Sequence, residues 1–284
     1  MRTSIIKRKL KDGKPALLTQ LHLTDASIFE MVSVMGFDGI WMDLEHHSYS
    51  LETAGNFIRA TRVGSADILA RTAKGEFMRM GRLLETGAQG IMYPRCSDAS
   101  EAEEVVRWAK FAPLGERGFD GAGADAFYTG IPMDEYVRDA NEETFVVIQL
   151  EDPKAIEQAE AIAAVEGVDV IMLGPADFSV LSGIPGQFDH PSIEKSLNKI
   201  AQAAANTGKH WASTAADANS AKGLLQRGAG MILHNADICM VKKGLEIMRD
   251  DFSKLGFQFQ DLSLIHISEP TRRYAISYAV FCLK

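Results

Sequence analysis

Two acidic side chains, Glu151 and Asp177, each follow a short apolar segment of the chain. A pair of carboxylates suits Mg²⁺ or Mn²⁺, because these ions take waters or substrate oxygens at their remaining coordination positions. The tripeptide 151–153 (EDP) fits the first turn of a helix equally well, because acidic residues are favoured at the positive end of the helix dipole. Residue types alone therefore leave two hypotheses: the pair forms a metal site, or residues 151–153 begin a helix.

Three further side chains have acid–base or anion-binding chemistry. His46 can act as a general acid or base near neutral pH, as can the adjacent His47, although a histidine in such a place is more often structural. Arg71 follows the apolar residues 68–70, where its guanidinium can bind a carboxylate or stabilise an enolate oxygen. No serine elbow or Cys/His arrangement stands out, so hydrolysis through a nucleophile lacks support.

The segments that must position these residues alternate between short apolar strands and amphipathic helices. This pattern indicates βαβ units with a parallel sheet. Eight strands are expected at residues 16–21, 39–42, 67–70, 90–93, 145–150, 168–173, 209–212 and 230–233.

Eight strands and eight helices predict a single α/β domain over residues 1–261, folded as a (β/α)8 TIM barrel. The alternative is an open doubly wound sheet, but the first βα turn, residues 22–25 (HLTD), lacks a glycine-rich phosphate fingerprint. We expect the long excursion at residues 111–143 to carry a helix that covers the barrel mouth. The last helix has an apolar stripe that must pack on something: Ile238, Val241, Leu245, Met248 and Phe252.

Active sites of such barrels lie at the carboxyl ends of the strands. Under this fold, Glu151 and Asp177 end adjacent strands, which brings both carboxylates to one rim. Other polar side chains follow the strands as well, and their joint occurrence indicates an active site: His22, 43–47 (DLEHH), Arg71 and 234–235 (HN).

Composition excludes several functional classes. The 284 residues include 30 Lys and Arg against 38 Asp and Glu, a formal charge of −8 that disfavours nucleic-acid binding. The sequence has no long apolar run for a membrane span or signal peptide, so a cytoplasmic location is expected. Cys96, Cys239 and Cys282 show no zinc-site or disulfide pattern, so reduced thiols are expected.

The last 23 residues differ from the rest of the chain. Residues 262–272 (LSLIHISEPTR) and 276–283 (ISYAVFCL) resemble the translation of a sequencing-library adapter. We interpret residues 262–284 as a non-native read-through tail and leave them out of the fold.

The order and spacing of several motifs make the chain resemble the HpcH/HpaI aldolase family, the metal-dependent class II pyruvate aldolases that include 2,4-dihydroxyhept-2-ene-1,7-dioate aldolase. The resemblance covers nearly all of residues 1–261. It implies a barrel of the phosphoenolpyruvate/pyruvate superfamily and a homo-oligomer, commonly a hexamer, whose eighth helix packs on a neighbouring subunit. The matching motifs are 36–38 (GFD), 43–46 (DLEH), Arg71, 83–90 (LLETGAQG), 113–118 (PLGERG), 149–151 (QLE), 165–169 (VEGVD) and 174–179 (GPADFS).

The resemblance also implies roles for individual residues. It makes Glu151 and Asp177 the ligands of a divalent metal, Mg²⁺ or Mn²⁺, with Co²⁺ as a further candidate. His46 takes the acid–base step, Arg71 stabilises the enolate, and Glu85 raises the basicity of the histidine. The remaining implied roles are substrate contacts by Gln149, Asp177 and the backbone at Ala176, and orientation of metal-bound water by Asp43 and Glu45.

The implied reaction cleaves a 4-hydroxy-2-oxo acid to pyruvate and an aldehyde through a metal-stabilised pyruvate enolate. Three positions depart from the family pattern: Glu85 stands where many members have Asp, Arg95 stands where apolar residues are common, and His234 differs at strand eight. Arg95 is a candidate second anchor for a carboxylate, and the aldehyde stays open. Two alternatives are a carbon–carbon lyase acting on a CoA thioester, as in citrate-lyase-like barrels, and a non-catalytic barrel.

Overall fold

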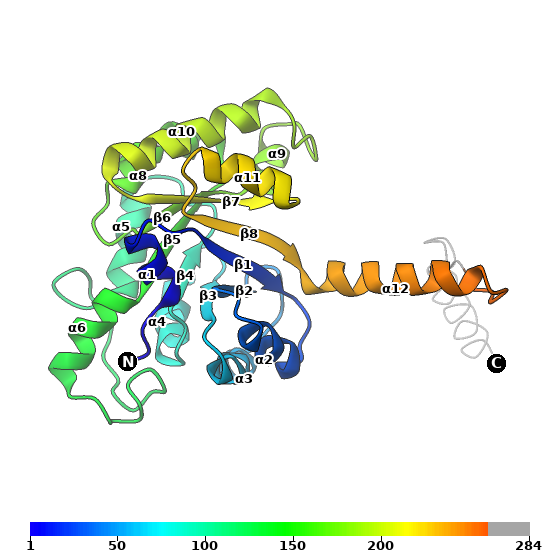
Figure 1. The fold of residues 1–284 in the computed structure, drawn as a ribbon. Coiled ribbons are helices and arrows are strands. Elements are labelled where there is room, and N and C mark those ends of the chain that lie inside the picture. Colours follow the sequence, from blue (N-terminus) through cyan, green and yellow to red (C-terminus); the bar gives the residue numbers. More distant parts are fainter. Residues whose placement is uncertain (261–284) are drawn as a thin grey trace, which may run out of the picture. The chain divides into compact units, whose positions relative to one another are not determined.

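The computed structural model describes residues 1–260, which fall into two units, Met1–Ile238 and a second unit that begins at Cys239. In the first unit, eight parallel strands close into a barrel in sequence order (Figure 1). The predicted (β/α)8 fold is confirmed. The strands are β1 (Ala16–Leu21), β2 (Gly39–Asp43), β3 (Asp67–Arg71), β4 (Gly90–Tyr93), β5 (Phe145–Leu150), β6 (Val170–Leu173), β7 (His210–Ala215) and β8 (Met231–Ala236).

Helices alternate with these strands and cover the outside of the barrel (Figure 1). In the first unit they are α1 (Ile5–Lys11), α2 (Ala26–Val34), α3 (Leu51–Ala60), the 3₁₀ turn η1 (Thr61–Val63), α4 (Phe77–Glu85), α5 (Ala99–Ala109), α6 (Met133–Glu143), α7 (Pro153–Glu157), α8 (Ala159–Ala163), α9 (Pro175–Leu181), α10 (Pro191–Thr207) and α11 (Ala218–Gln226).

The strands lie where the sequence predicts them, with ends that differ by at most three residues. β2 and β3 each run one residue further than expected, because Asp43 and Arg71 pair in parallel register. β8 runs to Ala236, which pairs with Gln20 of β1. Asp43 and Arg71 are therefore strand residues, fixed by the sheet, and do not belong to loops.

The strands build two apolar layers, because successive side chains of a strand point to opposite faces. In β5, Phe145 and Val147 point into the barrel, whereas Val146 and Ile148 pack outward beneath the helices. The next inward position of β5 is Gln149. The same alternation leads inward from Leu18 to Gln20 in β1, from Trp41 to Asp43 in β2, and from Leu69 to Arg71 in β3. The interior is thus apolar through most of its depth and polar at the carboxyl end.

Helix α1 closes the opposite end of the barrel. Its Ile6 and Leu10 join the inner apolar cluster. The close approach depends on Gly39 at the start of β2, where a Cβ would lie 2.8 Å from Ile6 Cδ1. The barrel therefore opens only at its carboxyl end.

The excursion at 111–143 carries a helix, as expected, but its predicted position over the barrel mouth is wrong. Helix α6 ends just before β5 begins, and Lys110 Nζ donates to backbone oxygens of Asn141 and Thr144 there. Phe111 and Tyr136 form a small apolar cluster against which Met1 packs. The excursion therefore lies at the end where the strands start, because α5 has already returned the chain to that end.

The second unit contains most of helix α12 (Asp237–Ser253), which carries the expected stripe of apolar side chains at three- and four-residue spacing. The tail at 262–284 lies outside the described residues, so its interpretation stays a prediction. Within residues 1–260 the helices are all too short or too polar to cross a membrane.

Candidate active site

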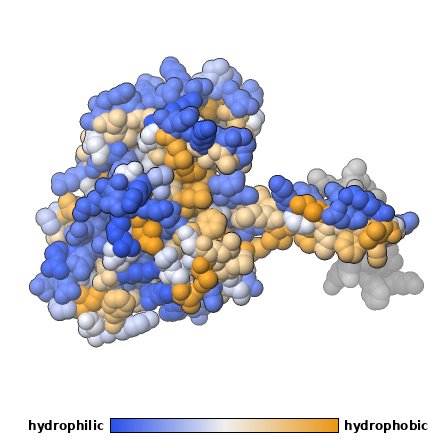
Figure 2. All heavy atoms as spheres, in the orientation of Figure 1, coloured by the Kyte–Doolittle hydropathy of each residue, from blue (hydrophilic) through white to orange (hydrophobic). Residues whose placement is uncertain are grey.

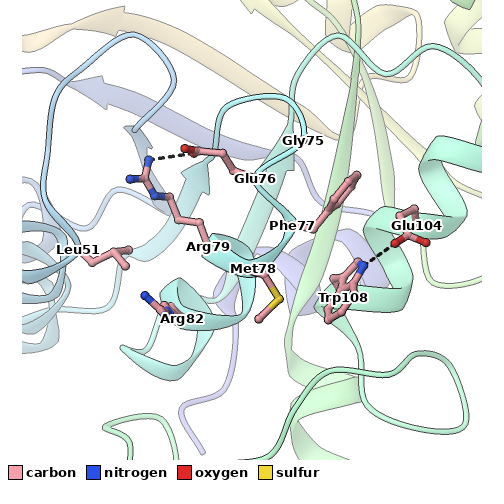
Figure 3. Close-up of a pocket in the computed structure, with 9 residues that line it drawn as sticks. All are labelled: Leu51, Gly75, Glu76, Phe77, Met78, Arg79, Arg82, Glu104 and Trp108. Atoms are coloured by element: carbon pink, nitrogen blue, oxygen red, sulfur yellow. Dashed lines mark hydrogen bonds and ion pairs between the residues drawn. The ribbon is translucent and has the colours of Figure 1, made fainter.

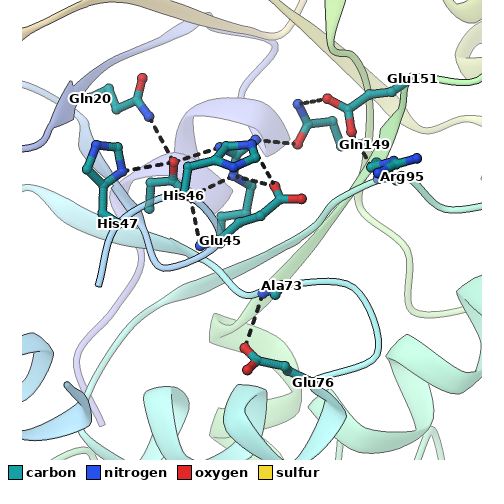
Figure 4. Close-up of polar contacts among 11 residues, drawn as sticks. Gln20, Glu45, His46, His47, Ala73, Glu76, Arg95, Gln149 and Glu151 are labelled. Atoms are coloured by element: carbon teal, nitrogen blue, oxygen red, sulfur yellow. Dashed lines mark hydrogen bonds and ion pairs between the residues drawn. The ribbon is translucent and has the colours of Figure 1, made fainter. Parts of the chain in front are cut away.

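A cavity of about 900 Å³ opens at the carboxyl end of the barrel. Its polar end gathers most of the residues that the sequence singled out. Figure 4 shows contacts of some of them, among them that of Gln149 with Glu151. The predicted site residues that line it are Asp43, His46, Arg71, Gln149, Glu151, Ala176 and Asp177, and Gln20, His22, Trp41 and His47 line it as well.

Arg71 lies at the centre of the polar network and is only 4% exposed. Its Nε and Nη2 donate to the two carboxylate oxygens of Asp43 at 2.9 and 2.7 Å, and its Nη1 donates to Gln149 Oε1 at 3.3 Å. Its guanidinium carbon lies 4.6 Å from the centre of the Trp41 ring. A guanidinium has five N–H groups, and three of them donate within the described residues. The other two N–H groups have no hydrogen-bond partner within residues 1–260.

Asp43 and Glu45 both form ion pairs with Arg71. Burial raises the pKa of Asp43, but the hydrogen bond and charge of Arg71 outweigh burial, so its pKa lies below the ordinary value. Glu45 Oε2 lies 3.2 Å from Arg71 Nε, and burial raises the pKa of Glu45 despite that charge. The structure shows both of them paired with Arg71. Their role in orienting metal-bound water stays a prediction.

Glu151 is held by three neighbours at the end of β5. Gln149 Nε2 donates to its Oε1 at 2.8 Å, and the backbone N–H of Arg95 donates to its Oε2 at 3.0 Å. Gly174 leaves the space for this carboxylate, because a Cβ there would lie 2.2 Å from Glu151 Oε1. Gln149 thus connects Arg71 to Glu151 through a single side-chain amide.

The electrostatics of Glu151 suit a cation. Burial, and next the charge of Asp177 in the first turn of α9, raise the pKa of Glu151 to about 7. A divalent ion between the two groups would offset both effects, and carboxylate oxygens are the ligands that Mg²⁺ and Mn²⁺ prefer. Within residues 1–260, no group of three or more His, Cys, Asp and Glu side chains is arranged to hold a metal. The donor set fits a two-carboxylate site whose remaining positions belong to water and substrate.

Three histidines surround the arginine and its carboxylates. The side chain of His46 is 57% exposed, and its Nε2 lies 3.7 Å from Glu45 Oε2. His47 Nδ1 lies 3.2 Å from Asp43 Oδ2, and its ring centre lies 4.1 Å from that of His22. His46 is therefore the more accessible of the two adjacent histidines, and His47 is the one tied to Asp43.

Glu85 is not brought to this cavity. It is the last residue of α4, which runs back toward the start of the strands, and its backbone oxygen accepts from Asp125 N of the excursion. Burial raises its pKa, with smaller effects from Arg117 and Asp125. The implied pairing of Glu85 with His46 is therefore absent within the described part of one chain, because α4 spans the height of the barrel between them.

Three other positions lie outside the cavity lining. Arg95 supports Glu151 through its backbone, while its side chain is exposed. His234 Nδ1 lies 2.8 Å from Ala215 O and ties β8 to β7. Cys96 is buried, which raises the pKa of its thiol to about 12. A role for the Arg95 side chain as a carboxylate anchor stays a prediction.

Sequence reasoning did not select Gln20 or Trp41. Gln20 Nε2 lies 3.5 Å from Asp43 Oδ2, and Trp41 packs on the guanidinium of Arg71. The available signal was the alternation within β1 and β2, which places Gln20 and Trp41 on the inner face with Leu18 and Asp43.

A second cavity of about 480 Å³ lies between the outer parts of α4 and α5 (Figure 3). Glu76 pairs there with Arg79 at 2.9 Å, and Trp108 Nε1 donates to Glu104 Oε1 at 2.5 Å. It contains none of the residues that the sequence singled out, so the cavity at the barrel mouth is the candidate active site.

Comparisons with known proteins agree with this fold. Residues 19–241 match the family model described as HpcH/HpaI aldolase/citrate lyase. The chain is 28% identical to a hydroxypyruvate/pyruvate aldolase of Pseudomonas aeruginosa, over 87% of this chain and 91% of that protein. It is also 28% identical to a 4-hydroxy-2-oxo-heptane-1,7-dioate aldolase of Escherichia coli, over 87% and 94%.

Among solved structures, an HpcH/HpaI aldolase from Desulfitobacterium hafniense superimposes with a TM-score of 0.81 at 31% identity, covering 90% of this chain and 98% of that one. The family model spans well over half of the chain, and the two relatives and the solved structure described above are all aldolases. The chain therefore belongs to the HpcH/HpaI aldolase/citrate lyase family, and it is a carbon–carbon lyase of the aldolase type.

Proposed function

We propose that this aldolase cleaves a 4-hydroxy-2-oxo acid to pyruvate and an aldehyde with the help of a divalent metal ion. The observation that carries the proposal is the buried Arg71, which has two N–H groups without a hydrogen-bond partner within residues 1–260 and lines the same cavity as Glu151 and Asp177. A cavity with a cationic fork and a carboxylate pair suits a substrate that develops negative charge on one oxygen and also binds a cation. The names of the Pseudomonas and Escherichia relatives support this choice of substrate class.

The proposed metal ligands are Glu151 and Asp177, with Mg²⁺ or Mn²⁺ as the expected ions and Co²⁺ as a further candidate. When bound, such an ion withdraws electron density from the carboxylate and keto oxygens of a 2-oxo acid. Gln149 keeps the Glu151 carboxylate in position through its hydrogen bond at 2.8 Å. The backbone at Ala176, exposed at the start of α9 beside Asp177, is the proposed further contact for the substrate.

Arg71 stabilises the charge that forms when the carbon–carbon bond breaks. The bond between C3 and C4 leaves its electron pair on the pyruvate part, and the pair delocalises onto the C2 oxygen as an enolate. Because Asp43 accepts from both Nε and Nη2, the guanidinium cannot rotate toward solvent. A donor that is already oriented costs no reorganisation in the transition state.

A base must take the proton from the 4-hydroxyl group as the aldehyde forms. We assign this step to His46, which lines the cavity, is more accessible than His47 and lies near Glu45. The proton balance closes when a proton is delivered to C3 of the enolate to give pyruvate.

Pyruvate in D₂O tests the proposal, because an enzyme that forms the enolate exchanges the methyl protons of pyruvate for deuterium. We expect proton loss by NMR with Mg²⁺ or Mn²⁺ and none with EDTA. Arg71→Ala and His46→Ala should abolish the exchange, whereas Arg79→Ala, in the outer cavity, should leave it unchanged. Loss of exchange in His47→Ala but not in His46→Ala would move the base to His47.

Absence of exchange by folded, metal-loaded wild-type protein would refute the pyruvate chemistry. Tight CoA binding by the same protein would then favour the thioester lyase. If Glu151→Ala changes nothing except metal affinity, the barrel is non-catalytic.

We also propose that the chain forms a homo-oligomer. Within its own unit, α12 exposes an apolar stripe that includes Leu245 and Phe252, and the first unit exposes Met31 and Val34 of α2 and the next residue, Met35. Several exposed apolar side chains on one helix face are typical of subunit contacts. The proposed occupant of the α2 face is α12 of a second copy.

A further inference from the structure

The cavity at the barrel mouth continues away from the polar site into a groove between α10 and α11. We propose that this groove binds the aldehyde part of the substrate, and that this part is an uncharged apolar chain or ring. The inference rests on the proposed function, because it names the aldehyde that the aldolase releases.

The cavity is much larger than pyruvate requires. Pyruvate has six non-hydrogen atoms, which take up roughly 180 Å³ at the ~30 Å³ that a water-sized group occupies in a liquid. The cavity measures about 900 Å³. Most of its volume therefore lies outside the polar end and is available to the rest of a longer substrate.

The groove has an apolar strip that the polar end lacks, next to polar side chains such as His190, Thr214 and Ser220. Ile193 and Leu197 of α10 face it from one side and Leu224 of α11 from the other, while Phe188 lies on the loop before α10. Both helices contact β7, which fixes the two walls (Figure 1). Phe188 is 55% exposed, so an apolar ligand in the groove would cover an aromatic ring that otherwise faces water.

The charges in the groove disfavour an acidic aldehyde. Among the described residues that line this arm, Arg227 is the only Lys or Arg, and its Nη2 donates to Glu194 at 2.8 Å. Asp189 adds a further negative charge beside it. His190 also lines this arm, and its Nδ1 lies 2.8 Å from Ser192 Oγ. An aldehyde with a second carboxylate would therefore meet two acids, a histidine that already contacts Ser192 and a cation that is already paired, so we expect an uncharged aldehyde to bind better.

Figure 2 shows that the surface of the first unit mixes polar and apolar residues, so exposure alone does not single out the groove. Continuity with the site does, because one cavity holds both Arg71 and Leu224. A substrate with its oxo-acid end at Arg71 can extend its other end along the groove.

The test measures aldol addition of unbranched aldehydes, from acetaldehyde to hexanal, to pyruvate with Mn²⁺, with succinic semialdehyde as the acidic comparison. Burial of one methylene is worth about a fourfold gain in kcat/KM. We expect roughly this increase per carbon up to hexanal, with succinic semialdehyde below butanal. A flat series, or succinic semialdehyde as the best acceptor, would overturn the inference.

Two variants test whether the preference for longer aldehydes arises in the groove. Leu197→Trp should narrow the groove and lower kcat/KM for hexanal at least tenfold while acetaldehyde changes less than twofold. Phe188→Ala, at an exposed position that does not threaten folding, should reduce the preference for hexanal severalfold. Phe127→Ala is the matched control, because Phe127 is also 55% exposed but lies in the excursion at the other end of the barrel.

Pyruvate exchange in D₂O is measured in parallel and should be equal in all these proteins. Exchange in the wild type with no dependence on chain length would refute the groove alone. Absence of exchange would refute the proposed function, and the inference with it. Equal losses for hexanal and acetaldehyde in Leu197→Trp would show that the groove does not select the aldehyde.

Discussion

Substitution of Gly174 by alanine tests whether the space around Glu151 sets metal affinity. The added Cβ would lie 2.2 Å from Glu151 Oε1 and 2.6 Å from Gln149 Nε2, whereas ordinary contacts begin at 3.4 Å. The carboxylate must therefore move by about 1 Å, because 3.4 minus 2.2 is 1.2. Gly174 has φ −95° and ψ 92°, a conformation that alanine adopts without strain. The effect should thus be confined to the site.

A ligand displaced by about 1 Å falls well outside the tolerance of ~0.2 Å that metal–ligand distances allow. We expect the Kd for Mn²⁺ to rise about tenfold to hundredfold, or roughly 1.4–2.7 kcal/mol, the range found when groups that orient a metal ligand are changed. Free Mn²⁺ can be followed by electron paramagnetic resonance, with thermal unfolding as a check on the fold.

Gly81→Ala is the control for this experiment. Gly81 lies in α4, and a Cβ there would contact nothing within 4 Å. Alanine should stabilise that helix by about 0.5–1 kcal/mol and leave the Kd for Mn²⁺ unchanged. If Gly174→Ala binds Mn²⁺ as tightly as the wild type, Glu151 is not a metal ligand in the position that the structure shows.

Three further predictions concern charge, pH and assembly. Arg71→Lys should slow pyruvate exchange about 10²–10³-fold by NMR, because an ammonium cannot replace the fork on Asp43, and unchanged exchange would remove Arg71 from the reaction. Burial raises the pKa of Asp67 to about 6 from 3.8, so the native state binds this proton more tightly than the unfolded state does. The contribution of Asp67 to the free energy of unfolding should be largest below pH 4 and should fall by on the order of 3 kcal/mol as the pH rises from about 4 to 6. Urea unfolding of the wild type and of Asp67→Asn over this pH range measures the contribution, and an equal pH slope in both proteins would contradict the assignment. Leu245→Asp should dissociate the oligomer, which light scattering would show as a lower mass, while the barrel should still unfold cooperatively on heating. An unchanged mass would show that α12 does not join subunits.

Much of the fold could be predicted from the sequence. Short apolar segments alternating with helices require parallel strands, and eight of them close into a barrel. Once the barrel is assumed, Glu151 and Asp177 must share a rim, because they follow neighbouring strands. These conclusions depend only on the period of the apolar pattern and the order of the elements, both of which are local properties of the chain.

The partners of each charged side chain depended on the tertiary structure. Asp43 pairs with Arg71 because β2 and β3 place the two residues in register, a relation that neither strand contains by itself. Gln20 and Trp41 belong to the site for the same reason, since they share the inner face at that level of the barrel.

Position along the barrel axis was also decided only in three dimensions. Nine residues of α4 rise about 13 Å at 1.5 Å per residue, so Glu85 lies at the far end from His46 although both belong to motifs of the same family. The excursion at 111–143 lies at that same far end, because α5 returns the chain before it begins. The sequence alone determined the barrel and the set of reactive side chains, whereas strand register and helix length decided which of them meet.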